Sequence, residues 1–163
     1  MNQTKKNIEF IKNSGIDYFL QDSPRKWFES PAKKVKTQNN IQQNGKLEQL
    51  DEIIVSLKNH ETILKKSAKN LVVFDGNLDA KVMFIGEAPG RDEDEQGIPF
   101  VGRAGQLLNK MLSAINLKRD EVYITNVVNY RPPSNRKPEL KEIKRYSKYL
   151  YEHVEIIDPK IIV

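Results

Sequence analysis

A short turn, "GEAPG" at residues 86–90, places two glycines, a proline and a carboxylate at the end of an apolar run. An aromatic residue, Phe100, follows a little further along, and an amide, Asn126, lies near the end of the next apolar run. A planar ring, an amide that both donates and accepts hydrogen bonds, and a rigid turn are the parts needed to read a base extruded from a nucleic acid. The pattern therefore predicts a pocket for a flipped base.

Each of these residues also has an ordinary structural explanation. Phe100 could be a core residue, and Asn126 could cap a helix or satisfy backbone groups. The two glycines could form a strained turn that binds no ligand. Gly86 and Gly90 could also hold a phosphate, because backbone N–H groups at a strand-to-helix turn bind anions. Their spacing fits neither a Walker A loop nor a dinucleotide fingerprint, and Pro89 removes one N–H donor, so a nucleotide cofactor is disfavoured.

Other chemistries find little support in the sequence. The acidic run 92–95 is consecutive, unlike the alternating ligands of an EF-hand, and is expected to be a solvated loop with one carboxylate available to brace the adjoining turn. His60 and His153 fall in predicted helices and are expected at the surface or half-buried, with no Ser-His-Asp arrangement around them. The chain has no cysteine, which excludes disulfides, a Cys nucleophile and thiolate metal ligands.

The elements that must position these residues alternate between strands and helices. Strands are predicted in the apolar runs "AKVMFIG" (80–86), "VYITNVV" (122–128) and "PKIIV" (159–163). The core begins near Val72 with "VVFDGN" (72–77), which is short and β-branched and ends in a turn signal. A helix is predicted after "VGRAG", with Leu107, Leu108, Met111, Leu112 and Ile115 on one face, and another after Pro138, with Leu140, Ile143, Leu150 and Val154 on one face. This order predicts a parallel sheet with helices on its faces. Ligands bind at the carboxyl ends of such strands, so the "GEAPG" turn and Asn126 should converge on one rim.

The first part of the chain, 1–60, is predicted to be a helical extension of the domain that occupies 61–163. Ile8, Phe10, Ile11 and Ile16 form a rough helical stripe, Ser30–Lys46 is interpreted as a flexible basic linker, and the apolar residues from Leu47 to Leu57 predict an amphipathic helix.

Composition narrows the class of protein. The 163 residues suffice for one core, the mean hydropathy is −0.63, and no apolar run approaches the roughly 20 residues of a membrane span. The N-terminus lacks the apolar segment of a signal peptide, which predicts a cytoplasmic protein that makes no use of a membrane. A net charge of +5 suits a polyanionic partner, although solvated lysine faces would explain it equally well.

The segments "MFIGEAPGRDEDEQGIPFVGRAGQLLNKML", "VYITNVVNYRPPSNRKP" and "IDPKIIV" resemble the uracil-DNA glycosylase superfamily, specifically its family-four-like bacterial and archaeal branch. The resemblance covers about residues 71–163. It implies a three-layer α/β/α sandwich around a four-stranded parallel sheet. It also implies a monomer that hydrolyses the N-glycosidic bond of deoxyuridine in DNA and so begins base excision repair.

By the same resemblance, individual residues take roles. Glu87 is the catalytic residue, and it belongs with the surrounding backbone to the motif on the side of the attacking water. The uracil-binding residues are Gly86, Ala88, Phe100 and Asn126, with Phe100 stacking on the base and Asn126 reading its edge. The residues expected to bind DNA or brace the site are Gly90, Arg103, Arg131, Asn135 and Arg136.

The chain departs from the family in two respects. Members with an iron–sulfur cluster carry four cysteines, whereas Tyr130 and Tyr146 stand where one cysteine pair would be, so neither a cluster nor any other cofactor or metal is expected and aromatic packing could replace the cluster as a local staple. The sequence also stops before the family's His-Pro-Ser-type motif. Three hypotheses remain open: a glycosylase whose C-terminal part lies outside this sequence, a catalytically weak or inactive uracil- or DNA-binding fragment, and a nucleotide-binding scaffold.

Overall fold

A computed structural model describes residues 37–163, with side chains described from residue 45 onward. The predicted helical stripe from Ile8 to Ile16 and the first part of the predicted linker, 30–36, lie outside the described residues. Residues Val35–Val163 form one compact unit.

The centre of this unit is a four-stranded sheet with the strand order β1-β3-β2-β4. The strands are β1 (Phe74–Gly76), β2 (Val82–Gly86), β3 (Tyr123–Asn126) and β4 (Ile161–Ile162). Strand β2 pairs in parallel with β3 and with β4, which confirms the predicted α/β class. Strand β1 departs from the fully parallel prediction, because it pairs antiparallel with β3. Only residues 77–81 separate β1 from β2, and a parallel crossover needs a connection of about a dozen residues or more, so β1 must run against its neighbours.

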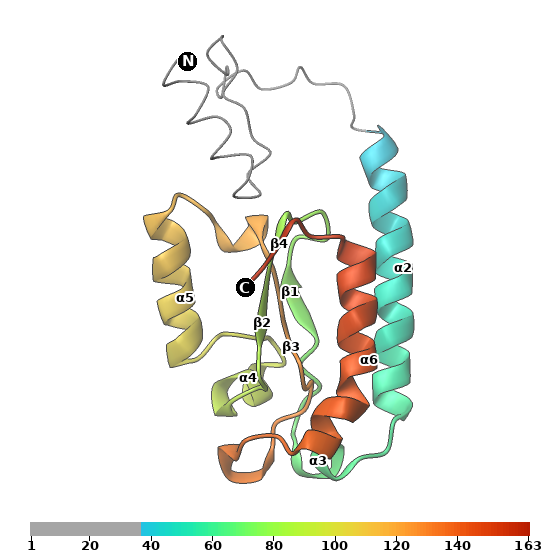
Figure 1. Ribbon diagram of the computed structural model, residues 1–163, viewed down its shortest axis with the longest axis vertical. Helices are drawn as coiled ribbons and strands as arrows, with labels where there is room; N and C mark the ends of the chain where they lie inside the picture. The colour runs from blue at the N-terminus through green and yellow to red at the C-terminus, as the bar shows by residue number, and fades with distance from the viewer. Residues whose placement is uncertain (1–36) are drawn as a thin grey trace, which may run out of the picture. The chain divides into compact units, whose positions relative to one another are not determined.

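Helices cover both faces of the sheet, as Figure 1 shows. Helix α5 (Arg103–Ala114) covers one face, while α6 (Leu140–Ile157) and α2 (Thr37–Asn59) cover the other. Successive residues of β2 serve the two sides alternately: Phe84 packs with the buried residues of α5, whereas Met83 belongs to the core that includes α2 and α6. The predicted three-layer sandwich is therefore present. Four shorter elements lie along the chain between these strands and helices: α3 (Ile63–Ser67), α4 (Arg91–Gln96), η1 (Arg119–Glu121) and η2 (Pro133–Asn135).

Helix α2 begins inside the segment that was predicted to be a linker. Residues 37–46, predicted to be linker, are helical and form the first turns of α2. The helix is anchored by its buried residues Leu50, Ile53 and Leu57, which belong to the same core cluster as the sheet. Lys46 also donates a hydrogen bond to the Leu78 carbonyl oxygen, at 3.0 Å. The predicted division near residue 60 thus falls inside the compact unit.

Two predicted helical faces also differ from the observed ones. Of the five apolar residues predicted to form one face around α5, Leu108 and Leu112 are buried, whereas Leu107, Met111 and Ile115 are each more than half exposed. On α6 the buried face is largely aromatic and polar and consists of Glu142, Tyr146, Tyr149, His153 and Ile157, while Leu140 is 78% exposed. Within residues 37–163 no helix combines the length and apolar character that crossing a membrane would require.

Candidate functional site

The ends of β2 and β3 meet at one rim of the sheet, as the sequence predicted. In the parallel pairing, Gly86 lies directly beside Asn126. The ladder continues past both strands, because the backbone N–H of Val127 donates to the Gly86 carbonyl oxygen at 2.8 Å. A cavity of about 480 Å³ opens at this rim. Its lining includes eight predicted site residues: Gly86, Glu87, Ala88, Gly90, Phe100, Arg103, Asn126 and Asn135.

Gly86 permits the closest contacts in this cavity. A Cβ atom at this position would lie 2.7 and 2.8 Å from two atoms of the Phe100 ring, and closer still to the Oδ1 atom of Asn126. Glycine is therefore the residue that fits at this position between the Phe100 ring and the Asn126 amide. The Phe100 ring also packs against the core cluster that contains Leu108 and Ile124, so it is both a wall of the cavity and part of the core.

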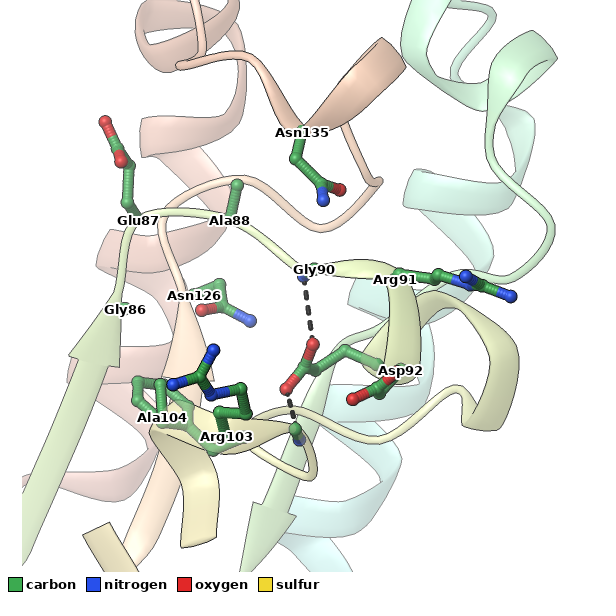
Figure 2. A pocket seen from close by; sticks show the side chains of 13 residues that line it. Gly86, Glu87, Ala88, Gly90, Arg91, Asp92, Arg103, Ala104, Asn126 and Asn135 are labelled. Atoms are coloured by element: carbon green, nitrogen blue, oxygen red, sulfur yellow. Dashed lines mark hydrogen bonds between the residues drawn. The ribbon is translucent and has the colours of Figure 1, made fainter. Parts of the chain in front are cut away.

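Asn126 supplies an unsatisfied donor to the cavity. Its side chain is only 4% exposed, and its Nδ2 atom has no hydrogen-bond partner among the described residues. Buried polar groups are almost always hydrogen-bonded, and an exception calls for an explanation such as a ligand. Figure 2 shows the Asn126 amide inside the cavity, below Ala88 and Gly90. A carbonyl oxygen of a bound ligand could satisfy this donor.

Glu93, which no sequence pattern distinguishes from its acidic neighbours, joins the two loops that form the cavity. One carboxylate oxygen accepts from the Gly90 backbone N–H at 3.1 Å, and the other accepts from Val101 at 3.0 Å and from Gly102 at 2.8 Å. Figure 2 draws the bond from Gly90 as a dashed line. Three backbone donors at one buried carboxylate fix the "GEAPG" turn against the loop after Phe100.

The next acidic residue, Asp94, performs a similar role on the other side of α4. Its Oδ1 atom accepts from the backbone N–H groups of Lys69 at 2.8 Å and Asn70 at 3.0 Å. The prediction of a solvated acidic loop is therefore wrong: residues 91–96 form a helix, and Glu93 and Asp94 are buried. Consecutive acids do not reveal which of them find backbone donors distant in sequence, so only the suggestion of one bracing carboxylate could be made.

Phe100 has a strained backbone. Its φ angle is 54°, in the left-handed region that costs a non-glycine residue about 1–3 kcal/mol. Arg119 holds this segment: its Nη1 donates to the Phe100 carbonyl oxygen at 3.0 Å and its Nη2 donates to that of Pro99 at 2.6 Å. The Nε of Arg119 donates to Asp75 at 2.6 Å. On the far side, the absence of a Cβ at Gly105 leaves room for the Phe100 carbonyl group.

Glu87 and Arg103 lie at the open side of the cavity. Both side chains are exposed. In Figure 2 the Glu87 carboxylate points away from the Asn126 amide, whereas Arg103 extends on the same side of the cavity as Asn126. The assigned catalytic role of Glu87 therefore requires its side chain, or a water molecule held by it, to reach inward when a substrate is bound.

Three further predicted residues lie on the loop between β3 and α6. Asn135 lines the cavity and accepts a hydrogen bond from Arg131 Nε at 2.7 Å. Arg136 does not line the cavity; it donates two hydrogen bonds, at 2.8 and 2.7 Å, to the carboxylate of Glu142 on α6. These bonds hold the pKa of Glu142 below its usual value and raise that of Arg136. Arg131 braces Asn135 and Arg136 braces the loop, so both lie beside the cavity without forming its wall.

The two histidines lie on the opposite side of the sheet from the α5 layer. His60 is half-buried, as predicted, and its Nδ1 atom pairs with the Tyr149 hydroxyl at 3.0 Å. His153 is 1% exposed, so the prediction of a surface or half-buried position is wrong for it. Its Nδ1 atom lies 2.6 Å from the Tyr123 hydroxyl, and burial lowers the pKa of His153 to about 4. Neither histidine lines the cavity.

Aromatic side chains occupy the region where cluster-bearing relatives are expected to carry cysteines. The rings of Tyr130 and Tyr146 meet edge-on with centroids 6.5 Å apart, and the Tyr146 hydroxyl pairs with Thr62 Oγ1 at 3.0 Å. Burial raises the pKa of both tyrosines. Thr62 caps α3, so this pair connects α3 to α6. Without cysteine there is no thiolate for a cluster, and residues 37–163 contain no group of three metal-ligating side chains.

Comparison with known proteins agrees with this geometry. Residues 73–163 match the uracil DNA glycosylase superfamily, more than half of the chain, and the chain belongs to that superfamily. Within it, the chain is similar to type-4 uracil-DNA glycosylases. It is 47% identical to the one from Archaeoglobus fulgidus over 118 residues, which cover 72% of this chain and 59% of that protein. It is 49% identical to the one from Sulfurisphaera tokodaii over 118 residues, 72% of this chain and 53% of that protein. For the one from Saccharolobus solfataricus the identity is 52% over 101 residues, 61% and 47% of the two chains. The chain thus spans about half the length of these curated relatives.

Proposed function

We propose that this chain carries the uracil-recognition site of a uracil-DNA glycosylase, which flips deoxyuridine out of DNA as a monomer and hydrolyses its N-glycosidic bond as the first step of base excision repair. Membership of the superfamily and the similarity to type-4 uracil-DNA glycosylases support this assignment. The observation that carries it is the buried, unpartnered Nδ2 of Asn126 beside the Phe100 ring.

Asn126 is proposed to read the edge of the base. Its Nδ2 can donate to O4 of uracil while its Oδ1 accepts from N3–H. Cytosine presents the opposite pair at these positions, an amino donor and an unprotonated ring nitrogen. Each buried hydrogen bond left unmade costs about 1–3 kcal/mol, so two mismatched groups would reject cytosine strongly. Phe100 supplies a ring for stacking, and Gly86 and Ala88 leave room for the base.

Catalysis and DNA binding are assigned to the rim of the cavity. Glu87 is proposed to hold the attacking water on the sugar side of the base. Arg103 and Arg131 are proposed to contact the phosphates that flank the flipped nucleotide, with Asn135 fixed beside them and Arg136 bracing their loop. Gly90 is proposed to brace the site through its bond to Glu93.

Binding of uracil without turnover is the second candidate. It is favoured by the outward direction of the Glu87 carboxylate and by a described cavity lining that contains arginines but no histidine. Negative charge develops on the uracil as the glycosidic bond breaks, and removal of one preorganised donor for such charge commonly costs about 10²–10³ in rate. The chain would then bind the uracil base in DNA without cleaving its glycosidic bond at an appreciable rate.

Both candidates are tested with one set of oligonucleotides that differ only in a central uracil, thymine or cytosine. Affinity is measured by fluorescence anisotropy, and excision is detected by alkaline cleavage at the resulting abasic site. The proposal expects tighter binding to uracil than to cytosine, and excision that is lost in Glu87→Gln while binding persists. Selective binding with no excision would support the second candidate. Equal affinity for the three bases together with no excision would refute both.

A further inference from the structure

Arg119 does not line the cavity of the candidate site, but it contacts Phe100, which does. It belongs to η1, immediately before β3, and its side chain is a quarter exposed. Its guanidinium nevertheless bonds to the two successive carbonyl groups of Pro99 and Phe100. Among its bonding partners Phe100 lines the cavity, so Arg119 can influence a bound base through Phe100.

We propose that Arg119 is a positioning residue that keeps the Phe100 ring in place as the stacking wall of the uracil site. The proposal rests on the function proposed above for Phe100. Because a left-handed backbone is unfavourable for phenylalanine, this conformation persists only where the surroundings over-determine it. The surroundings here are few and can be named.

Three contacts hold the Phe100 backbone from different directions. The Glu93 carboxylate accepts hydrogen bonds from the backbone N–H groups of Val101 and Gly102, which follow Phe100, at 3.0 and 2.8 Å. Gly105 leaves room for its carbonyl group against α5. Arg119 binds the carbonyl oxygens of Phe100 itself and of the residue before it. Of these three residues, only Arg119 bonds to the backbone that precedes Phe100, at the carbonyl oxygen of Pro99.

The shape of arginine suits this task. The guanidinium is planar and carries five N–H donors in a fixed fork, so one group can bind two neighbouring carbonyls on one side and a carboxylate on another. Asp75 of β1 takes the Nε donor at 2.6 Å, and Asn109 of α5 accepts from Nη1 at 3.2 Å. The clamp is therefore itself anchored to the sheet and to a helix. A lysine could pair with Asp75 or bond one carbonyl, but it could not hold all of these groups.

The test compares Arg119→Ala and Arg119→Lys with Asn109→Ala, a matched control that removes one partner of the same guanidinium but not its bonds to Phe100. Base–aromatic stacking gives the scale of the effect, and the loss of part of it lowers affinity for a uracil oligonucleotide about 5- to 30-fold in Arg119→Ala. Arg119→Lys should lie between this variant and the wild type. Asn109→Ala should change affinity less than about twofold.

A double-mutant cycle identifies the route of the effect. If Arg119 acts through the ring, Phe100→Ala and Phe100→Ala/Arg119→Ala bind the uracil oligonucleotide equally well. An Arg119→Ala penalty that persists in full in the Phe100→Ala background would overturn the proposal. So would wild-type uracil affinity in a folded Arg119→Ala protein.

A second measurement does not depend on uracil binding. The six phenylalanines are labelled with 4-fluorophenylalanine, and the Phe100 signal is identified by its loss in Phe100→Leu. The ¹⁹F resonance of Phe100 should shift or broaden in Arg119→Ala and in Arg119→Lys, but not in Asn109→Ala. An unchanged resonance in both Arg119 variants would overturn the positioning role. If the wild type failed to prefer uracil to cytosine, the proposed function would fall, while this spectrum would still decide whether Arg119 holds Phe100.

Discussion

Two buried asparagines, three positions apart on one segment, allow the site to be separated from the fold. Asn126 is 4% exposed and its Nδ2 is unpartnered, whereas Asn129 is 2% exposed and its Nδ2 donates to the Val72 carbonyl oxygen at 3.2 Å. We expect Asn126→Ala to abolish uracil recognition with little loss of stability. We expect Asn129→Ala to have the opposite pair of effects.

The magnitudes follow from the hydrogen bonds. An unsatisfied buried donor costs about 1–3 kcal/mol, and its removal in Asn126→Ala offsets the packing that is lost, so the free energy of unfolding should change by less than about 1 kcal/mol. Two hydrogen bonds to uracil are lost in the same variant. At about 1–3 kcal/mol each, affinity for a uracil oligonucleotide should fall at least about 30-fold. In Asn129→Ala the buried Val72 carbonyl loses its donor, so unfolding should become easier by about 1–3 kcal/mol while uracil affinity stays as in the wild type.

The assays are urea unfolding followed by circular dichroism and anisotropy titration with uracil and cytosine oligonucleotides. Asn126→Ala should bind both oligonucleotides with nearly the same affinity. The reasoning would be refuted if Asn126→Ala lost more than about 3 kcal/mol of stability, because the amide would then be satisfied within the fold and not reserved for a ligand. Wild-type selectivity in that variant would refute the assigned role directly.

Three more outcomes follow from other contacts. Gly86→Ala places a Cβ against the Phe100 ring and should lower the free energy of unfolding by about 1–3 kcal/mol and remove most of the uracil affinity. The same unfolding and titration assays measure both effects, and normal affinity would show that the ring can move aside. His153 has a pKa of about 4 in the folded protein and 6.5 in the unfolded chain, so between these values only the unfolded state takes up the proton. The free energy of unfolding should therefore be at its full value above pH 6.5 and fall by about 3 kcal/mol as the pH drops towards 4, which urea titrations at several pH values measure. An equally steep fall in a His153→Gln variant would contradict this. Thr62→Val removes the hydrogen-bond partner of the buried Tyr146 hydroxyl and should lower the free energy of unfolding by about 1–3 kcal/mol without changing uracil affinity. An unchanged melting temperature would mean that this hydrogen bond does not stabilise the packing of α3 against α6.

The sheet and the meeting of the two motifs were predictable because they depend on local signals. Continuous apolar runs ending at Gly86 and near Asn126 predict buried parallel strands, and parallel strands bring their carboxyl ends to one rim. The structure pairs these two residues side by side. The antiparallel direction of β1 was missed although its cause is local: residues 77–81 are too few for a crossover.

The supports of the site were not predictable, because each depends on partners distant in sequence. Nothing in "RDEDEQ" distinguishes Glu93 and Asp94, which find buried backbone donors, from Asp92 and Glu95, which remain exposed. Arg119 lies in an unremarkable turn. Its carbonyl partners and Asp75 come from two other segments, so only the folded chain shows that it holds the Phe100 segment.

The unsatisfied amide and the strained phenylalanine are connected by Gly86. The absence of a side chain there lets the ring and the Asn126 amide approach each other, and the left-handed backbone at Phe100 lies in the loop that carries the ring to that position. Each feature is unfavourable for folding taken alone: a buried donor without a partner and a φ of 54° at an aromatic residue. Both residues line one cavity. Arg119, which does not line the cavity, binds the Phe100 carbonyl oxygen, and the Glu93 carboxylate accepts hydrogen bonds from the backbone that follows Phe100. A fold that maintains two such costs at one place is expected to recover them on binding, since a flat ligand with a carbonyl group at its edge would stack on the ring and satisfy the amide together. Uracil is flat and carries that carbonyl group, so a single ligand accounts for both departures.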